Sequence, residues 1–178
     1  MQRPIWADEP VRITPPDAAL AAEADRLRRE LQTLLAPWLA GTVEHVGSTA
    51  VPGLQSKPIV DLLGPVRDLD AADDAAATLA AANWELVPPE ADIRPWRRFH
   101  VLPRAGARAA HLHLIAHDHP RCREMLVFRD HLRRDRRTAA AYGRLKERLA
   151  RDHVLDREAY TRAKAAFVDE VLEGLGER

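Results

Sequence analysis

The chain has 178 residues, 46% of them apolar and 30% charged, and a formal net charge of zero, which predicts a soluble globular protein and argues against long nucleic acid as a ligand. Its single cysteine, Cys122, excludes an internal disulfide and a cysteine-rich metal site. Because the N-terminus has no signal-peptide core and no apolar run approaches the roughly 20 residues of a membrane span, we expect a cytoplasmic protein without a membrane segment, and its oligomeric state is left open.

The N-terminal third of the chain predicts a lead-in, a helix and two strands. Residues 1–16, which end in two prolines, are predicted to form an extended lead-in. Asp17 is typical of a helix N-cap, and apolar residues then recur at helical spacing, which predicts an amphipathic helix over residues 18–36. Residues 42–47 and 58–63 are each predicted to form a short buried strand, and the segment between them contains Gly and Ser.

The rest of the chain changes from mixed structure to helices alone. Residues 69–82 predict an Ala-rich helix, and residues 84–87 a short strand. Residues 98–102 and 111–115 flank a turn region with Pro and Gly, which predicts a β-hairpin. Helical stripes follow over residues 120–176. This order predicts an α+β fold, and since no repeat or long linker divides the chain, we expect one domain over all 178 residues.

The segment EHVGSTAVPGLQSKPIVD, residues 44–61, gathers residues that are scarce elsewhere. Both serines of the chain lie in it, as does one of the three lysines, Lys57, against 24 arginines. Gly47 and Ser48 follow a predicted strand, where backbone N–H groups and a hydroxyl can approach a phosphate. We predict that Gly47, Ser48 and Thr49 contact phosphate. The alternatives are an ordinary turn and chance within a biased composition.

Asp61 interrupts an apolar strand. Alternation along that strand places Asp61 on one face with Ile59 and Leu63. A carboxylate in a buried strand is unfavourable unless it is paired or binds a metal ion. We predict a metal-binding role for Asp61, and the alternative is a structural ion pair with an arginine.

Two histidines and one glutamate extend this candidate site. The pattern HLHL places His111 and His113 on the same face of one strand, which suits a metal-binding pair or a general base with its orienting neighbour. Coincidence among eight histidines is the alternative. Of Glu44 and His45, which face opposite ways, at most one shares a face with Asp61, and we favour Glu44 as a further metal ligand.

Two Tyr-x-x-x-Lys steps mark the C-terminal helices. Tyr142 and Lys146, and likewise Tyr160 and Lys164, lie four residues apart and therefore on one helix face. Such a cationic face can cover a nucleotide. The alternative is a packed tyrosine with a solvated lysine beside it.

The segment EHVGSTAVPGLQSKPIVDLL resembles the signature of the GrpB family. The resemblance extends to HLHLI at 111–115, FRDHL at 128–132, YGRLK at 142–146 and YTRAK at 160–164, and it covers residues 10 to 172. It implies a nucleotidyltransferase-like mixed β-sheet core flanked by helices, with a helical C-terminal part. In that superfold, a Gly-Ser turn and an acid-x-acid strand position a triphosphate and two metal ions, and a third acid comes from a later strand.

This chain departs from the superfold pattern at two positions. The second acid falls on Leu63, and the later acid falls on the His111-Leu112-His113 strand. Catalysis by two metal ions requires carboxylates that bridge both ions. One carboxylate with two histidines indicates a single ion, a softer metal or no metal.

These observations lead to one hypothesis and its alternatives. We predict a nucleotidyltransferase-like enzyme that binds ATP or another nucleoside triphosphate with Mg²⁺ or another divalent ion, and activates or modifies a small-molecule acceptor. Asp61 would bind the ion, and His111 or His113 would complete its coordination or accept a proton. The remaining cofactor-binding residues would be Lys57, Arg98, Arg129, Tyr142, Lys146 and Lys164. The alternatives are a non-catalytic module for a nucleotide or CoA precursor, and a metal-dependent biosynthetic enzyme of another reaction class.

Overall fold

The structure is a computed structural model that describes residues 10–177, with the side chain of Arg157 excepted. The first nine residues of the predicted lead-in lie outside this range. Its remaining residues are extended, and Thr14 pairs with Ser56 through a backbone hydrogen bond of 2.8 Å from Thr14 N to Ser56 O. This pairing ties the lead-in to the segment that precedes strand β2 (Val60–Val66).

The first helix, α1 (Ala18–Leu34), begins at the predicted N-cap. Asp17 accepts a hydrogen bond of 2.8 Å from the backbone N–H of Ala19. Ala24, Leu27 and Leu31 form the buried stripe that the periodicity predicts. The helix therefore covers the sheet with the face that carries its apolar residues.

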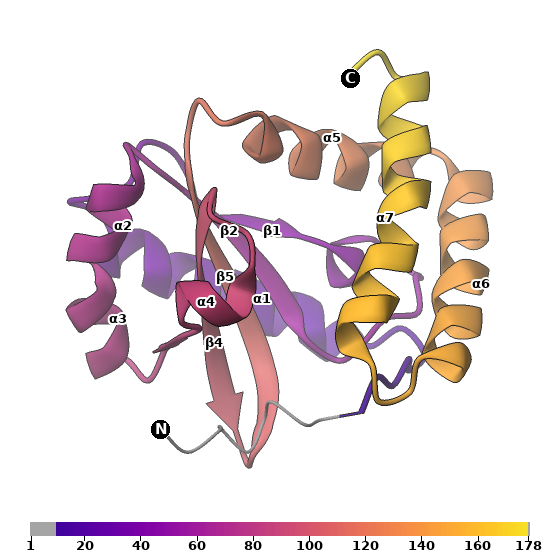
Figure 1. Cartoon of the computed structure of the whole chain (residues 1–178), viewed down its shortest axis with the longest axis horizontal. Helices are drawn as coiled ribbons and strands as arrows, with labels where there is room; N and C mark the ends of the chain where they lie inside the picture. The colour runs from indigo at the N-terminus through magenta and orange to yellow at the C-terminus, as the bar shows by residue number, and fades with distance from the viewer. Residues whose placement is uncertain (1–9, 178) are drawn as a thin grey trace.

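Within the described residues, five strands form one mixed sheet in the order β1-β2-β5-β4-β3 (Figure 1). Strands β2 and β5 are parallel, and the other neighbours are antiparallel. The mixed sheet expected from the family resemblance is confirmed. The bounds of the other strands are β1 (Glu44–Val46), β3 (Glu85–Leu86), β4 (Arg97–Arg104) and β5 (Ala107–Ala116).

The predicted hairpin is longer than its sequence pattern indicated. Strands β4 and β5 continue to Arg104 and Ala107 and leave a two-residue turn at Ala105 and Gly106. Both turn residues have positive φ, 51° and 79°, as two-residue hairpin turns require. The longer pairing extends the platform on which His111 and His113 lie.

One face of the sheet packs against α1 and a pair of short helices. The predicted helix over 69–82 is instead divided at Ala75 into α2 (Leu69–Asp74) and α3 (Ala76–Ala81). Leu62, Leu112 and Leu114 point from the sheet into this core and are fully buried. A short helix that the sequence analysis did not predict, α4 (Pro89–Asp92), precedes β4 and begins at a proline, a residue favoured in the first turn of a helix.

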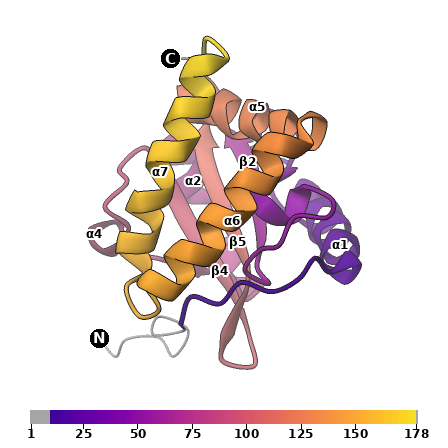
Figure 2. The ribbon, with the colours of Figure 1, turned by 90° about the vertical axis from the view of Figure 1, so that its right-hand side faces the viewer.

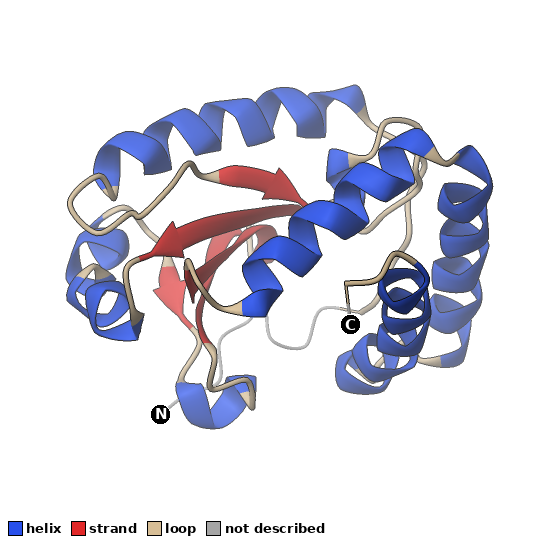
Figure 3. Ribbon diagram, turned by 90° about the horizontal axis from the view of Figure 1, so that it is seen from above, coloured by secondary structure: helices blue, strands red, loops and turns tan. Residues whose placement is uncertain are grey.

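The opposite face of the sheet lies beneath the C-terminal helices, α5 (Pro120–Arg134), α6 (Arg136–Asp152) and α7 (Arg157–Gly174). Figure 2 shows α6 and α7 crossing in front of the sheet, and Figure 3 shows the sheet between these helices and α1. Asp135 and Asp156 cap α6 and α7 at their N-termini. None of the helices in residues 10–177 has the length and apolar character needed to cross a membrane.

Candidate functional site

A cleft of about 270 Å³ lies between the sheet and the two last helices. Strands β2, β4 and β5 form its floor, and α6 and α7 contribute Tyr142, Lys146 and Lys164 to its wall. The turn at Gly47 and Ser48 and the segment around Asp92 close its sides. The C-terminal tyrosine–lysine helices thus reach the same cleft as the Gly-Ser turn.

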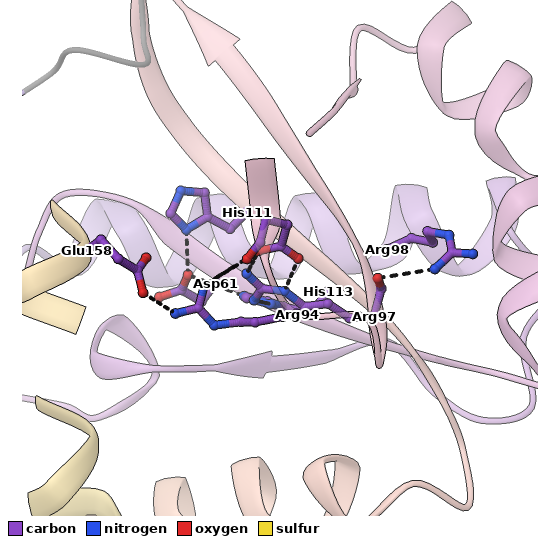
Figure 4. A network of polar contacts seen from close by, with 8 residues as sticks. Asp61, Arg94, Arg97, Arg98, His111, His113 and Glu158 are labelled. Carbon is purple, nitrogen blue, oxygen red and sulfur yellow. Dashed lines mark hydrogen bonds and ion pairs between the residues drawn. The ribbon is translucent and has the colours of Figure 1, made fainter. Parts of the chain in front are cut away.

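Asp61, His111 and His113 meet on the floor of the cleft (Figure 4). Asp61 and His111 are partners in the parallel register of β2 and β5, so their side chains leave the sheet side by side. Asp61 Oδ1 lies 2.8 Å from His111 Nδ1 and 3.8 Å from His113 Nε2. Alternation read from the sequence placed His111 and His113 on one face of their strand, and the register of β2 and β5 brings Asp61 onto the same face of the sheet. The catalytic roles of the three residues stay predictions.

Gly47 brings the backbone against this carboxylate. Its φ of 71° lies in the region that favours glycine. A Cβ at this position would lie 2.5 Å from Asp61 Oδ2, closer than Cβ atoms approach other atoms in proteins. The neighbouring hydroxyls are ordered too, because Ser48 is hydrogen-bonded to Tyr142 and Thr49 Oγ1 lies 2.9 Å from His45 Nε2.

Burial and hydrogen bonding set the charges of the cluster. Burial alone would raise the pKa of Asp61, but the hydrogen bonds from His111 and His113 outweigh it and hold the pKa well below its usual range. Burial lowers the pKa of His111 to about 3, against the opposing effect of Asp61, and burial followed by the charge of Arg97 lowers the pKa of His113. Because the Asp61 side chain is still 29% exposed, we take it as a carboxylate beside two neutral imidazoles.

Arg97 completes the floor of the cleft. Its Nη1 donates a hydrogen bond of 2.6 Å to His113 Nδ1, and its Nε donates one of 2.8 Å to Asp92 Oδ2. The guanidinium also lies 4.2 Å from the centre of the Phe99 ring. At the mouth of the cleft, Arg94 pairs with Glu158 of α7 at 3.1 Å (Figure 4).

Among the described residues, Asp61, His111 and His113 form the one group of three whose ligand atoms, all within 4.8 Å of one another, could hold a metal ion. The carboxylate fits a divalent ion that arrives with a triphosphate, because Mg²⁺ is usually held by one or two carboxylates and phosphate oxygens. The imidazoles fit less well. A ligating histidine normally donates its second N–H to an acceptor, whereas the second nitrogen of His113 faces the donor Arg97.

Lysines and arginines surround the rest of the cleft. Lys57 and Lys164 lie over the Tyr160 ring, 5.4 and 5.5 Å from its centre. Lys146 is 1% exposed and donates a 2.6 Å hydrogen bond to the carbonyl of Gln55. Burial, followed by the charge of Lys164, lowers the pKa of Lys146 to about 7. A buried amine of this kind regains its charge when an anion binds beside it.

Three predicted residues do not lie at the site. Glu44 shares a face with Asp61, but its carboxylate binds Arg129 Nη1 at 2.8 Å, and neither residue lines the cleft. Their roles as metal ligand and phosphate-binding arginine stay predictions. Arg98 projects from the opposite face of β4 and binds Asp73 of α2. Figure 4 shows Arg98 apart from Asp61 and the two histidines.

Sequence reasoning missed several residues that line the cleft: Ser56, Asp92, Arg94, Arg97, Phe99, Arg108, Glu158 and Thr161. The basic run over residues 94–108 was a signal for the arginines, although it did not reveal which of them face the site. Asp92 belongs to the helix that was not predicted. Its pairing with Arg97 therefore had no sequence signal.

A larger hollow of about 1160 Å³ lies on the other side of the sheet, between α1, α3 and strands β3 and β4. Its lining includes Leu27, Leu34 and Trp84, and it contains none of the histidines or carboxylates of the cluster. We therefore place the chemistry in the smaller cleft.

The family profile for "GrpB protein" matches residues 10–174 of the chain. The chain belongs to the GrpB family. A UPF0157 protein of Streptomyces coelicolor is 38% identical over 126 residues, which cover 71% of this chain and 64% of that protein. This GrpB-family chain thus spans less than two thirds of the length of that relative.

Two solved structures share the fold of this chain. A conserved GrpB protein from Enterococcus faecalis superposes with a TM-score of 0.74 at 24% identity, over 90% of this chain and 99% of that chain. A cytoplasmic RNA terminal U-transferase superposes with a TM-score of 0.51 at 17% identity, over 79% of this chain and 42% of that chain. At these identities the likeness shows the fold alone, so the activity must be argued from the site.

The departure at Leu63 has a structural basis in this GrpB-family chain. Leu63 follows Asp61 on the same face of β2, yet it is fully buried with Val46, Ile115 and Cys122 beneath α5. A second carboxylate at this position would lie inside an apolar cluster. The site therefore offers one strand carboxylate, Asp61, beside the Gly47 turn.

Proposed function

We propose that this cleft binds a nucleoside triphosphate together with its divalent ion, and that the protein activates or modifies a small-molecule acceptor as a nucleotidyltransferase-like enzyme. The observation that carries the proposal is the contact between the Gly47 turn and Asp61 at the floor of the cleft. Lys57, Lys146 and Lys164 line the same cleft. Backbone approach, a carboxylate and several cations together suit a metal-bound polyphosphate.

The residues have separable roles in this proposal. Ser48, Thr49 and the backbone at Gly47 contact phosphate, and Asp61 holds the ion, which neutralises charge on the triphosphate oxygens during transfer. Lys57, Lys146 and Lys164 balance the remaining phosphate charge. Tyr142 positions the Ser48 hydroxyl through the hydrogen bond that joins them.

The size and the titratable groups of the cleft bear on the acceptor. The cleft volume of about 270 Å³ lies just below the range of roughly 300–1,000 Å³ typical of small-molecule sites, so the acceptor in this proposal is small. Lys146, with a pKa of about 7, takes up a proton when an anionic substrate binds above neutral pH. Of the two imidazoles, His111 has a lone pair at Nε2 without a hydrogen-bond partner, but this atom is buried and burial lowers the pKa of His111 to about 3, so we do not assign the acceptor's proton to it.

A non-catalytic nucleotide-binding or CoA-precursor-binding module is the second candidate, and Leu63 favours it. With one strand carboxylate in place of two, the site can retain nucleotide binding and lose transfer. A metal-dependent biosynthetic enzyme of another reaction class would reuse the same cleft.

Phosphorus NMR separates these candidates. The protein is incubated with ATP, Mg²⁺ and a panel of amino acids, sugars and pantetheine compounds, and the ³¹P spectrum is followed with time. We expect loss of the triphosphate signals and the appearance of pyrophosphate or a new phosphoester with one class of acceptor, and no change with Asp61→Asn. An intact triphosphate with every acceptor would contradict transfer and favour the binding module.

A further inference from the structure

We propose that Arg97 is a positioning residue that commits His113 to presenting an N–H toward Asp61, and thereby keeps His113 from acting as a metal ligand. Asp61 then remains the group of the cluster that receives an ion. The role of that ion with a triphosphate rests on the proposed function, whereas the hydrogen bonding of His113 does not.

The chemistry of the two partners fixes the position of the proton on His113. A guanidinium has N–H donors and no acceptor. Because Arg97 Nη1 lies 2.6 Å from His113 Nδ1, the Nδ1 lone pair accepts this hydrogen bond. In a neutral imidazole the proton then lies on Nε2, which is 3.8 Å from Asp61 Oδ1. Nε2 consequently presents an N–H, and a metal ion requires a lone pair.

Arg97 cannot readily turn away from His113. Its Nε bonds Asp92 Oδ2, and the side chains of Arg97 and Asp92 are 9% and 5% exposed. Moving the guanidinium would leave a buried carboxylate without its partner, which is strongly unfavourable. Phe99 packs against the guanidinium as well. The Arg97 guanidinium is therefore held in place beside His113 by Asp92 of α4 and Phe99 of β4.

The second imidazole leads to the same assignment of Asp61. His111 Nδ1 lies 2.8 Å from Asp61 Oδ1, and an ionised carboxylate only accepts, so Nδ1 carries the proton. Asp61 Oδ1 thus faces N–H groups of both histidines, while Oδ2 lies against Gly47. The lone pair of His111 then lies on Nε2, which is buried. This pattern orients the carboxylate for an oxygen-preferring ion, and it disfavours ions such as Zn²⁺ and Co²⁺ that select imidazole.

The first test reads the tautomer of His113 in the wild-type protein without any nucleotide. Long-range ¹H–¹⁵N NMR of ¹⁵N-histidine-labelled protein distinguishes protonated from unprotonated ring nitrogens, and His113→Gln assigns the signals. We expect His113 to be protonated at Nε2 and unprotonated at Nδ1 at pH 7.5. A proton on Nδ1 would overturn the proposal.

The second test removes Arg97 and measures Co²⁺ binding by its visible absorption. In Arg97→Met the Nδ1 acceptor is released and His113 can offer a lone pair, so we expect Co²⁺ to bind about tenfold more tightly or more, since neighbours of ligating groups typically tune metal affinity by 10- to 100-fold. Adding His113→Gln to Arg97→Met should abolish the gain. Arg98→Met, on the opposite face of the same strand, is the matched control and should bind Co²⁺ as the wild type does.

The outcomes are separable from the fate of the proposed function, because neither test contains a nucleotide. If Arg97→Met does not fold, Asp92→Asn combined with Arg97→Met removes both charges of the buried pair and takes its place. The proposal would be overturned if the wild type bound Co²⁺ tightly and His113→Gln weakened that binding. Equal Co²⁺ affinity in Arg97→Met and wild type would overturn it as well.

Discussion

At the scale of single residues, the site depends on one glycine and one carboxylate. Gly47 has the backbone conformation that glycine favours, and the space that a side chain would need is taken by Asp61 Oδ2. A side chain at position 47 would therefore have two separate effects. Its strained backbone would lower the stability of the fold, and its contact with Asp61 would displace the carboxylate and weaken ligand binding.

Substitution of Gly47 tests this distinction. We expect Gly47→Ala to lower the free energy of unfolding by about 1–3 kcal/mol through backbone strain, and to weaken binding of MgATP because Asp61 must move. Gly53→Ala is the control, since Gly53 has a φ of 77° and no atom within 4 Å of the Cβ that alanine would add. Chemical denaturation and calorimetric titration measure both effects. Equal loss of MgATP affinity in the two variants would contradict the role given to Gly47.

At the scale of elements, strand β4 has side chains on both faces of the sheet that contact different parts of the molecule. Arg97 and Phe99 face the cleft, whereas Arg98 and His100 face α2 on the opposite side of the sheet. His100 is 1% exposed, and neither ring nitrogen has a hydrogen-bond partner among the described residues. Burial lowers its pKa to about 4, despite the opposing charge of Asp73.

This buried imidazole predicts part of the acid sensitivity of the fold. Its pKa is lower in the folded state than the usual 6.5, so its contribution to stability is present above pH 6.5 and is lost as the pH falls toward 4. The shift corresponds to a loss of about 2–3 kcal/mol between pH 7 and pH 4.5. We expect His100→Leu to reduce the fall in unfolding free energy over this range by that amount.

Urea denaturation at several pH values measures this difference. His117→Leu is the matched control, because His117 is an exposed histidine in the turn after β5. At pH 7, His100→Leu should be as stable as the wild type or more so, since it removes two buried polar atoms without partners. A pH dependence identical to that of the wild type would contradict the prediction.

At the scale of the whole molecule, local patterns predicted the elements better than the partners of their side chains. Period-two alternation placed Asp61 and His111 correctly on strand faces, because that property depends on adjacent residues. The ion pair between Glu44 and Arg129 joins residues 85 positions apart, which no local pattern encodes. Alternation along β4 places Arg97 and Arg98 on opposite faces of the sheet. Which of the two faces the cleft depends on the register of the β4–β5 hairpin, which the sequence pattern does not give.

The packing of α6 and α7 over the sheet could likewise not be predicted from the sequence pattern. The Tyr-x-x-x-Lys spacing placed Tyr142 and Lys146 on one helix face, and whether that face met the cleft depended on how the helices dock. The family resemblance supplied the fold, which the comparisons confirm. The chemistry of the site still rests on the arrangement of Asp61 and its neighbours.

The central claim is that Asp61 and the Gly47 turn bind a nucleoside triphosphate through its divalent ion. Thermal unfolding with ATP, with and without Mg²⁺, tests it in the wild type and in Asp61→Asn. With Mg²⁺ and ATP at about ten times the dissociation constant, we expect stabilisation of about 1.4 kcal/mol and a rise in Tm of about 3–6 °C, with a smaller rise when Mg²⁺ is absent or Asp61 is replaced. An unchanged Tm in the wild type at millimolar ATP and Mg²⁺ would contradict the account.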